Sequence, residues 1–399
     1  MKRLISFLLM MIFLAGCVRL PSSETTEPTN VPLTLPPTEA TTEATMEPTT
    51  EPTTEPTTEP TLTPTKAQLL FDLLTTEEKV GQLFLARCPK ENAVKDVTKY
   101  NLSGYILFGR DFRDKSHQNI NDNIASYQAA SKIPLLIAVD EEGGTVCRIS
   151  SQPQLRDSPF QSPRELYNMG GMQHILYTET EKIHLLKSLG INVNAAPVCD
   201  ITTDPEAFMF DRSLGQSPEI TGQFVASMIK LMDQQQIGGI LKHFPGYGNN
   251  TDTHIGIAVD NRTLSELENV DLIPFAAGIE AGAGAIMVTH TFVNCLDPEM
   301  PASLSPKVID YIRTEMEFEG VVVTDDLVMK AITDLYGAEE AAILAVLAGN
   351  DILCSSEYAT QYQAVLNAVN SGRIPEDMLN RAVMRVLQWK EHLGLLDSE

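Results

Sequence analysis

The chain has 399 residues, of which 29 are Lys or Arg and 53 are Asp or Glu, so its formal net charge is −24. This acidic balance argues against a nucleic-acid partner, because binding to phosphates depends on Lys and Arg side chains. With 43% hydrophobic and 21% charged residues, the composition is that of a globular protein with a sizeable core.

The first 17 residues are predicted to be a signal of the lipoprotein type. A basic start is followed by an apolar stretch at residues 4–14, which is shorter than the ~20 residues that span a bilayer. The sequence Leu-Ala-Gly-Cys at residues 14–17 resembles a bacterial lipobox, which implies cleavage before Cys17 and a diacylglycerol on its thiol. The alternative is an ordinary signal peptide with a chance Cys. We therefore expect lipidation of Cys17 and an extracytoplasmic protein anchored to the cell membrane.

Residues 18–65 are predicted to be a disordered linker rich in Thr, Glu and Pro. The unit Thr-Thr-Glu-Pro occurs three times in succession within residues 49–60, and the linker carries eight Glu but one Arg. Few apolar groups and repulsion between like charges prevent a core. A Pro-rich chain extends about 3.1 Å per residue, so the linker could reach roughly 150 Å. We expect it to hold a catalytic domain of residues 66–399 away from the membrane.

Residues 66–399 contain eight short apolar segments rich in Val, Ile and Leu. Each is apolar on both faces, as buried parallel strands are. The segments are 80–86, 104–108, 135–140, 191–197, 239–244, 285–290, 321–325 and 351–354.

Segments with a helical pattern lie between the apolar ones. The clearest are 118–130, 179–189, 220–236, 264–281, 305–316, 338–347, 358–370 and 375–393. Eight strands that alternate with helices predict an α/β fold of the (β/α)8 barrel type. A doubly wound open sheet is the structural alternative.

The cysteines other than Cys17 are scattered and odd in number, and they lack metal-site spacing such as Cys-x-x-Cys. We expect free, buried thiols that act as small hydrophobic groups, and no metal site. The five are Cys88, Cys147, Cys199, Cys295 and Cys354.

Ionisable side chains gather at the carboxyl ends of the apolar segments and in the loop after the fifth. In a parallel barrel these ends share the face on which active sites form. A single such residue is well explained by hydrogen bonds to the backbone, whereas a ring of them predicts a site. The residues are Asp140, Asp200, Lys242, His243, His290 and Asp325, with Asp252 and His254 in the loop.

Five motifs carry a resemblance to a known family. They are Val-Asp-Glu-Glu-Gly-Gly (139–144), Asn-Ala-Ala-Pro-Val (194–198), Asp-Arg-Ser-Leu-Gly (211–215), Lys-His-Phe-Pro-Gly-Tyr-Gly-Asn-Asn-Thr-Asp-Thr-His (242–254) and Thr-Asp-Asp-Leu-Val-Met (324–329). Together they resemble glycoside hydrolase family 3, and more closely its bacterial β-N-acetylglucosaminidases (β-N-acetylhexosaminidases). The resemblance covers about residues 66–397.

The resemblance implies a role for each matching residue. Asp325 matches the catalytic nucleophile, His254 matches the general acid/base, and Asp252 matches the partner of that His. Asp326, beside the nucleophile, is interpreted as structural. The residues that match those holding the terminal sugar are Asp140, Arg148, Arg212, Lys242 and His243.

The chemistry of these residue types fits the implied reaction. Glycoside hydrolysis commonly uses two carboxylic groups, one as acid and one as nucleophile. Here a His would replace the acid, and its ordinary pKa near 6.5 suits proton donation and return at neutral pH. Asp252 would orient the ring of His254 and favour its protonated form.

The sequence also departs from the family pattern. Tyr247 stands where members usually have His, and the three residues 249–251 stand where four are usual. Thr145 and Cys147 replace the usual Arg and Gln, while Arg148 is retained. The shortened loop bears on the choice of aglycone more than on the reaction, because both dyad residues are present.

We expect a retaining, exo-acting β-N-acetylhexosaminidase that releases terminal GlcNAc from peptidoglycan fragments or other glycans without a cofactor. The single Trp, Trp389, lies in the last predicted helix, so a long aromatic platform for a glycan is not expected. One alternative is a phosphorylase, since a His acid/base does not repel phosphate as a carboxylate would. Another is a sugar-binding lipoprotein without turnover. The sequence leaves the oligomeric state open.

Overall fold

The computed structural model describes residues 64–397, apart from residues 249, 251–252 and 254–255. The predicted signal, its lipidation site Cys17 and the linker up to residue 63 lie outside the described residues. So do the predicted catalytic residues Asp252 and His254. In the part of the chain that is described, no helix is both long and apolar enough to cross a membrane.

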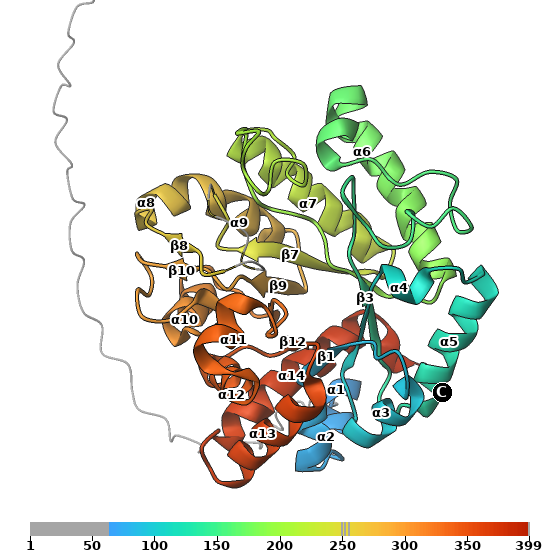
Figure 1. The fold of residues 1–399 in the computed structure, drawn as a ribbon, viewed down its shortest axis with the longest axis vertical. Coiled ribbons are helices and arrows are strands. Elements are labelled where there is room, and N and C mark those ends of the chain that lie inside the picture. The colour runs from blue at the N-terminus through green and yellow to red at the C-terminus, as the bar shows by residue number, and fades with distance from the viewer. Residues whose placement is uncertain (1–63, 249, 251–252, 254–255, 398–399) are drawn as a thin grey trace, which may run out of the picture. The chain divides into compact units, whose positions relative to one another are not determined.

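Eight parallel strands form the central sheet, in the order β11, β9, β7, β6, β3, β2, β1 and β12 (Figure 1). A parallel bridge between Val323 and Ile352 joins its two ends, so the barrel is nearly closed. This confirms the predicted α/β barrel, in place of a doubly wound open sheet. The strands are β1 (Phe84–Arg87), β2 (Gly104–Leu107), β3 (Leu136–Val139), β6 (Val193–Asn194), β7 (Gly238–Phe244), β9 (Ala285–Val288), β11 (Val321–Thr324) and β12 (Leu353–Ser355).

Helices surround the barrel (Figure 1). Those that follow the strands are α3 (Ala93–Tyr100), α4 (Gly109–Phe112), α5 (His117–Ala130), α6 (Pro163–Ser188), α7 (Pro218–Gln234), α8 (Leu264–Glu266), α9 (Leu272–Glu280), α10 (Pro306–Thr314), α11 (Lys330–Tyr336), α12 (Ala338–Ala348), α13 (Tyr358–Asn370) and α14 (Glu376–His392). Two helices, α1 (Lys66–Phe71) and α2 (Thr76–Gly81), precede β1. Two small two-stranded sheets lie outside the barrel sheet. One is an antiparallel hairpin of β4 (Glu141–Gly143) and β5 (Val146–Cys147), and the other is a parallel pair of β8 (Val259–Asp260) and β10 (Phe292–Val293).

The start of the first strand was predicted wrongly. Residues 80–81 end helix α2, because Thr75 and Glu78 form a capping box: each side chain accepts a hydrogen bond from the other residue's backbone N–H. The strand begins only at Phe84. A local capping signal therefore outweighed the apolar pattern.

The helix predicted at 179–189 begins much earlier, at Pro163. Ser162 caps it, Pro163 occupies its first turn, and Glu165 completes a capping box. Gly170 and Gly171 interrupt it with non-helical backbone, and this kink hides the helical period in the sequence.

Trp389 of α14 packs against the amino ends of the barrel strands and closes that end of the barrel. A Cβ atom on Gly284 would lie 2.3 Å from Nε1 of this indole, and one on Gly238 would lie 2.9 Å from its Cζ2 atom. Both glycines stand at the amino ends of strands, so only glycine lets the ring approach there. The barrel interior is therefore filled at the amino ends of the strands, which leaves the carboxyl ends for a site.

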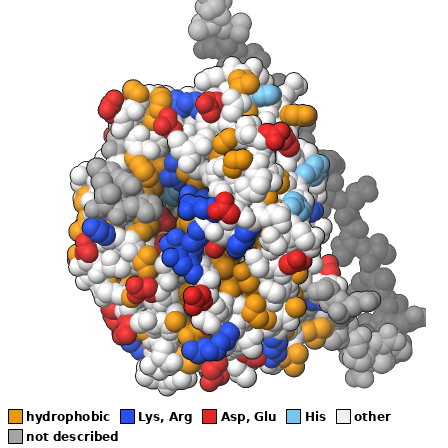
Figure 2. All heavy atoms as spheres, turned by 45° about the vertical axis from the view of Figure 1, so that its right-hand side comes forward, with side chains coloured by type: hydrophobic (Ala, Val, Ile, Leu, Met, Phe, Trp, Pro, Cys, Tyr) orange, Lys and Arg blue, Asp and Glu red, His pale blue; other side chains and the backbone are white. Residues whose placement is uncertain are grey.

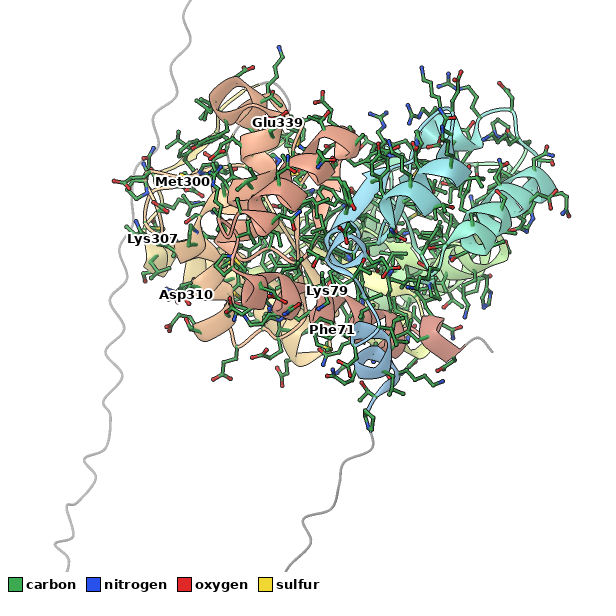
Figure 3. All side chains as sticks on the ribbon, turned by 90° about the horizontal axis from the view of Figure 1, so that it is seen from below. Phe71, Lys79, Met300, Lys307, Asp310 and Glu339 are labelled. Atoms are coloured by element: carbon green, nitrogen blue, oxygen red, sulfur yellow. The ribbon has the colours of Figure 1, made fainter. Side chains whose placement is uncertain are left out.

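The two ends of the described chain pack together. The backbone N–H of Lys66 in α1 donates to Glu391 Oε1 of α14 at 2.9 Å, and Lys390 Nζ donates to Gln82 Oε1 at 2.8 Å. Phe71 and Lys79 are labelled near each other in Figure 3, and the Lys79 ammonium lies 4.0 Å from the ring centroid of Phe71. The first and last helices thus belong to one packed unit.

The five described cysteines are all free. Cys88, Cys199 and Cys354 are buried as expected, and burial raises the pKa of the Cys88 thiol to about 12. Cys147 and Cys295 are only partly buried, so the prediction was wrong for these two. Both lie outside the barrel strands, in β5 and after β10.

Candidate active site

The carboxyl ends of the barrel strands surround a cavity of about 650 Å³. Basic side chains gather beside a hollow on the face shown in Figure 2. The structure brings six of the predicted site residues to this cavity. They are Asp140, Arg148, Arg212, Lys242, His243 and Asp325.

The hairpin of β4 and β5 places Arg148 at the cavity. The Glu141 carboxylate accepts hydrogen bonds from the backbone N–H groups of Arg148 and Ile149, both at 2.8 Å, and from that of Ser150 at 3.2 Å. Glu141 is fully buried and therefore acts as an internal anchor for the hairpin. This fold lets Arg148 Nη2 approach Asp140 Oδ2 to 3.4 Å.

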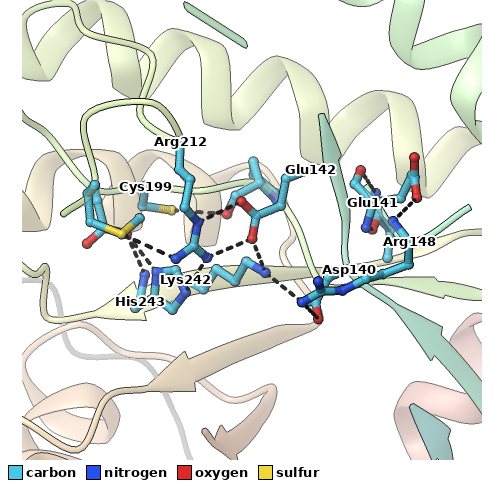
Figure 4. A network of polar contacts seen from close by, with 12 residues as sticks. Asp140, Glu141, Glu142, Arg148, Cys199, Arg212, Lys242 and His243 are labelled. Carbon is cyan, nitrogen blue, oxygen red and sulfur yellow. Dashed lines mark hydrogen bonds and ion pairs between the residues drawn. The ribbon is translucent and has the colours of Figure 1, made fainter. Parts of the chain in front are cut away.

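Lys242 joins two acidic residues at the centre of the site (Figure 4). Its ammonium lies 2.9 Å from Asp140 Oδ1 and 2.6 Å from Glu142 Oε1, and the side chain is almost wholly buried. The register of β7 with β9 shifts after Leu241, and the consecutive residues Lys242 and His243 both line the cavity.

Opposite charges keep this network ionised. Burial raises the pKa of Asp140, but the charges of Lys242 and Arg148 outweigh it and leave that pKa below its usual value. Arg212 and Lys242 lower the pKa of Glu142 still more strongly against the same effect of burial. The two carboxylates in turn raise the pKa of Lys242 despite its burial. Fixed charges of both signs therefore line the cavity at neutral pH.

Arg212 connects the acidic pair to His243 (Figure 4). Its Nε and Nη2 atoms bind the two oxygens of Glu142 at 2.9 and 2.8 Å, and Nη2 also lies 3.1 Å from His243 Nε2. Because Arg has only donors, Nε2 must accept, and Nδ1 carries the proton that it donates to Asp200 Oδ2 at 2.8 Å. Asp200 thus fixes both the tautomer and the orientation of the ring.

Asp325 follows β11 and presents its carboxylate to the cavity. Its Oδ1 accepts a hydrogen bond from the Asp326 N–H at 2.8 Å, whereas no described residue donates to its Oδ2. The neighbouring Asp326 carboxylate is held instead by Ser356 Oγ at 2.5 Å and by the Val328 N–H at 3.2 Å. Asp326 therefore ties two loops together, while one oxygen of Asp325 stays available for chemistry.

Tyr247 connects the floor of the site to the loop after β7. Its backbone N–H donates to Asp200 Oδ1 at 2.8 Å, and its hydroxyl lies 2.7 Å from Thr253 Oγ1. The ring packs edge-on against His243 and Phe208, with centroids 5.4 Å away in each case. Thr253 is fully buried and lies between Asp252 and His254 in the sequence.

Glu142 is the site residue that the sequence analysis missed. Its two oxygens bind Lys242 and Arg212, so it is the hub of the charged network. The available signal was its place as the last of three consecutive acidic residues, which begin at the strand-end Asp140 and precede a Gly-Gly turn. His290, in contrast, lies at a strand end as predicted but bonds to Ser303 Oγ at 2.7 Å and to the Asp326 carbonyl at 3.1 Å.

Within the described ranges, no group of three or more His, Cys, Asp or Glu residues could hold a metal ion. The carboxylates of Asp140 and Glu142 already bind cationic side chains of the protein. The arrangement therefore offers donors and acceptors to a neutral polyhydroxy ligand, with one free carboxylate oxygen on Asp325.

Comparison with known proteins gives consistent matches. The model of the glycosyl hydrolase family 3 N-terminal domain matches residues 75–389. A beta-hexosaminidase from Stenotrophomonas maltophilia is 35% identical over 261 residues, which cover 63% of this chain and 75% of that protein. Beta-hexosaminidase LpqI from Mycobacterium tuberculosis is 31% identical over 332 residues, which cover 80% of this chain and 83% of that protein.

Solved structures show the same likeness. A glycoside hydrolase family 3 beta-N-acetylglucosaminidase from Paenibacillus superposes with a TM-score of 0.76 and 31% identity, over 82% of this chain and 64% of that chain. The chain described here therefore spans less than two thirds of that protein. The structure of M. tuberculosis LpqI gives a TM-score of 0.74 and 29% identity, over 82% of this chain and 96% of that chain.

Proposed function

The chain belongs to glycoside hydrolase family 3, and from this we propose that it is a retaining, exo-acting β-N-acetylhexosaminidase that releases terminal GlcNAc. Relatives that match most of its length are named beta-hexosaminidases, which supports this substrate class. The observation that carries the mechanism is that an Asp325 oxygen to which no described residue donates lies in the same cavity as a network of charged side chains.

In the proposed mechanism, Asp325 Oδ2 attacks the anomeric carbon while the bond to the leaving oxygen breaks. His254 donates a proton to that oxygen, and Asp252 favours the protonated ring. The resulting glycosyl ester on Asp325 is then attacked by water, whose proton returns to His254. Two inversions at the anomeric carbon give net retention.

The charged network would hold the terminal sugar. Its donors are Arg148, Arg212 and Lys242, and Asp140 supplies acceptor oxygens for sugar hydroxyls, while the His243 ring, bonded to Asp200 and Arg212, helps to hold Arg212 in place. Because these groups are already bonded to one another, they need little rearrangement to bind a ligand. Side chains that include Trp389 fill the amino end of the barrel, so a glycan would reach the site from the carboxyl ends of the strands.

The location and the natural substrate are part of the proposal. A lipid on Cys17 and an extended linker over residues 18–65 would place the enzyme outside the cytoplasmic membrane, held to it by the anchor. Peptidoglycan fragments carry terminal GlcNAc and are the proposed glycan there. The linker, with its net negative charge and Pro content, supports a spacer role.

A product analysis tests the reaction. Hydrolysis of an aryl β-GlcNAc glycoside followed by proton NMR should show the β-anomer of GlcNAc first, before mutarotation. Early release of the α-anomer would contradict retention. The same assay with added phosphate should give no GlcNAc 1-phosphate, and accumulation of that ester would show a phosphorylase instead. Binding without any turnover would favour a sugar-binding protein.

A further inference from the structure

Arg87, at the carboxyl end of β1, lines the cavity and forms no ion pair with any described residue. Its Nε atom is buried and has no hydrogen-bond partner, and no described carboxylate forms an ion pair with it. Arg212, another partly buried arginine of the site, differs because it forms two hydrogen bonds with Glu142. A guanidinium group in a partly desolvated cavity is costly unless something pairs with it.

A second guanidinium group lies beside Arg87. The Cζ atom of Arg87 lies 4.3 Å from the ring centroid of Phe108, and that of Arg148 lies 5.4 Å from the same centroid. The Arg148 Nε is also buried and unpartnered, and its one carboxylate contact is a 3.4 Å approach to Asp140. Asp140 is in turn closer to Lys242, at 2.9 Å. Of the described carboxylates, only that of Asp140 lies within ion-pair distance of either arginine, so two guanidinium groups share one carboxylate that is also bound to Lys242.

The geometry suits an anion. A guanidinium group held against an aromatic ring keeps its in-plane N–H groups free to bind two oxygens of a carboxylate or a phosphate. Phe108 follows β2, and the pairing of Arg87 with Ile106 fixes the two strand ends side by side. The ring therefore holds both cations in place before a ligand arrives.

We propose that Arg87, together with Arg148, forms a subsite for an anionic group on the glycan, and that Arg87 is a specificity-determining residue. The inference rests on the proposed glycosidase function and extends it to the choice of substrate. The anion is a carboxylate on the sugar that leaves, as in N-acetylmuramic acid, or a phosphate on the terminal sugar. A carboxylate and a phosphate can each accept two parallel hydrogen bonds from the planar guanidinium group.

Paired substrates distinguish these sources. GlcNAc-β-1,4-MurNAc is compared with its methyl ester, which lacks the charge, by measurement of released GlcNAc. The 6-phosphate of an aryl β-GlcNAc glycoside is compared with the unphosphorylated glycoside. For each pair the ratio of kcat/KM, charged over neutral, reports the preference for an anion, and it is expected to exceed one in at least one pair.

The Arg87→Gln variant should lower the preference ratio about 10- to 100-fold, the usual worth of a hydrogen bond to a charged group. Arg87→Lys should retain part of the preference ratio, because the positive charge remains but the paired N–H donors of the planar guanidinium group are lost. The control is Arg113→Gln, which removes an equal charge from an exposed residue that does not line the cavity. This control should leave the ratio unchanged.

A fall confined to the MurNAc pair assigns the anion to the leaving sugar, and a fall confined to the phosphate pair assigns it to the terminal sugar. If wild-type enzyme shows no preference, or if Arg87→Gln leaves both ratios unchanged while turnover persists, the subsite is overturned and the proposed function stands. If wild-type enzyme hydrolyses none of the four glycosides, both proposals fall together.

Discussion

At the scale of single residues, the charged side chains of the site are paired with side chains of opposite charge. Lys242 is almost wholly buried yet ionised, because Asp140 and Glu142 lie within 2.9 and 2.6 Å of its ammonium. The sequence predicted Asp140 and Lys242 from their strand-end positions. It did not reveal Glu142, because this residue lies three positions beyond the end of β3, and the hairpin of β4 and β5 sets the direction of its side chain.

Replacement of Lys242 by Met should remove one of the two cations that each of Asp140 and Glu142 contacts, in a site that is largely shielded from water. We expect a loss of about 3–5 kcal/mol in the free energy of unfolding at pH 7, measured by urea denaturation. The folded pKa values of Asp140 and Glu142 are depressed, so their pairing stabilises the protein above about pH 4 and is lost as pH falls through the folded pKa values. The deficit of the variant should therefore shrink in acid.

A matched control for this variant is Lys307→Met. Lys307 pairs with Asp297 at 3.2 Å, but its side chain is 60% exposed. Such a pair contributes about 0–1 kcal/mol, so this variant should unfold almost like the wild type. Equal losses in the two variants would contradict the account of the buried network.

At the scale of elements, the apolar pattern predicted where strands lie but not where helices begin. All eight predicted segments overlap a barrel strand, but 191–197 is much longer than β6, and residues 80–86 include the end of α2. Side-chain caps at Thr75 and Ser162 decide those boundaries. The loop after β7 was predicted from motif residues alone, and its dyad of Asp252 and His254 stays a prediction.

Tyr247 holds this loop through Thr253, and the contact can be tested directly. Tyr247→Phe removes the hydroxyl, which should reduce kcat about 2- to 10-fold, the worth of one buried hydrogen bond. If the bond positions the flanking Asp252 and His254, a glycoside with a poor leaving group should lose more than an activated aryl glycoside. Thr253→Val should have the same effect.

The double variant supplies the control for this contact. With Tyr247→Phe and Thr253→Val combined, the loss should be close to that of either single change, because both remove the same bond. Fully additive losses, or equal losses on good and poor leaving groups, would contradict a positioning role.

At the scale of the whole molecule, Trp389 fills the barrel at the amino ends of its strands, and the first described helix, α1, packs against the last, α14. The sequence predicted this architecture because buried parallel strands are apolar on both faces and so stand out from helices. It gave no sign that the last helix carries the plug, Trp389, or a fully buried amine, Lys390. Both roles depend on the approach of α14 to the amino ends of the strands.

Lys390 should make the stability of the barrel depend on pH. Burial lowers its pKa from 10.5 to about 7, and its ammonium has one described partner, Gln82 Oε1. The unfolded chain then binds more protons than the folded chain between about pH 7 and pH 10, so this group makes stability rise with pH across that window. Lys390→Met should flatten the rise in unfolding free energy from pH 7 to pH 10, and an unchanged slope would contradict the assignment.

The central claim is that Asp325 is the nucleophile, and the most direct test is an Asp325→Ala variant assayed on an activated aryl β-GlcNAc glycoside with and without azide. The variant should be inactive in buffer alone. Azide should restore release of the aryl group and give the α-glycosyl azide, because the anion takes the place of the missing carboxylate. The control Asp334→Ala, an exposed change in α11, should keep wild-type turnover. Wild-type-like hydrolysis by folded Asp325→Ala protein would contradict the account.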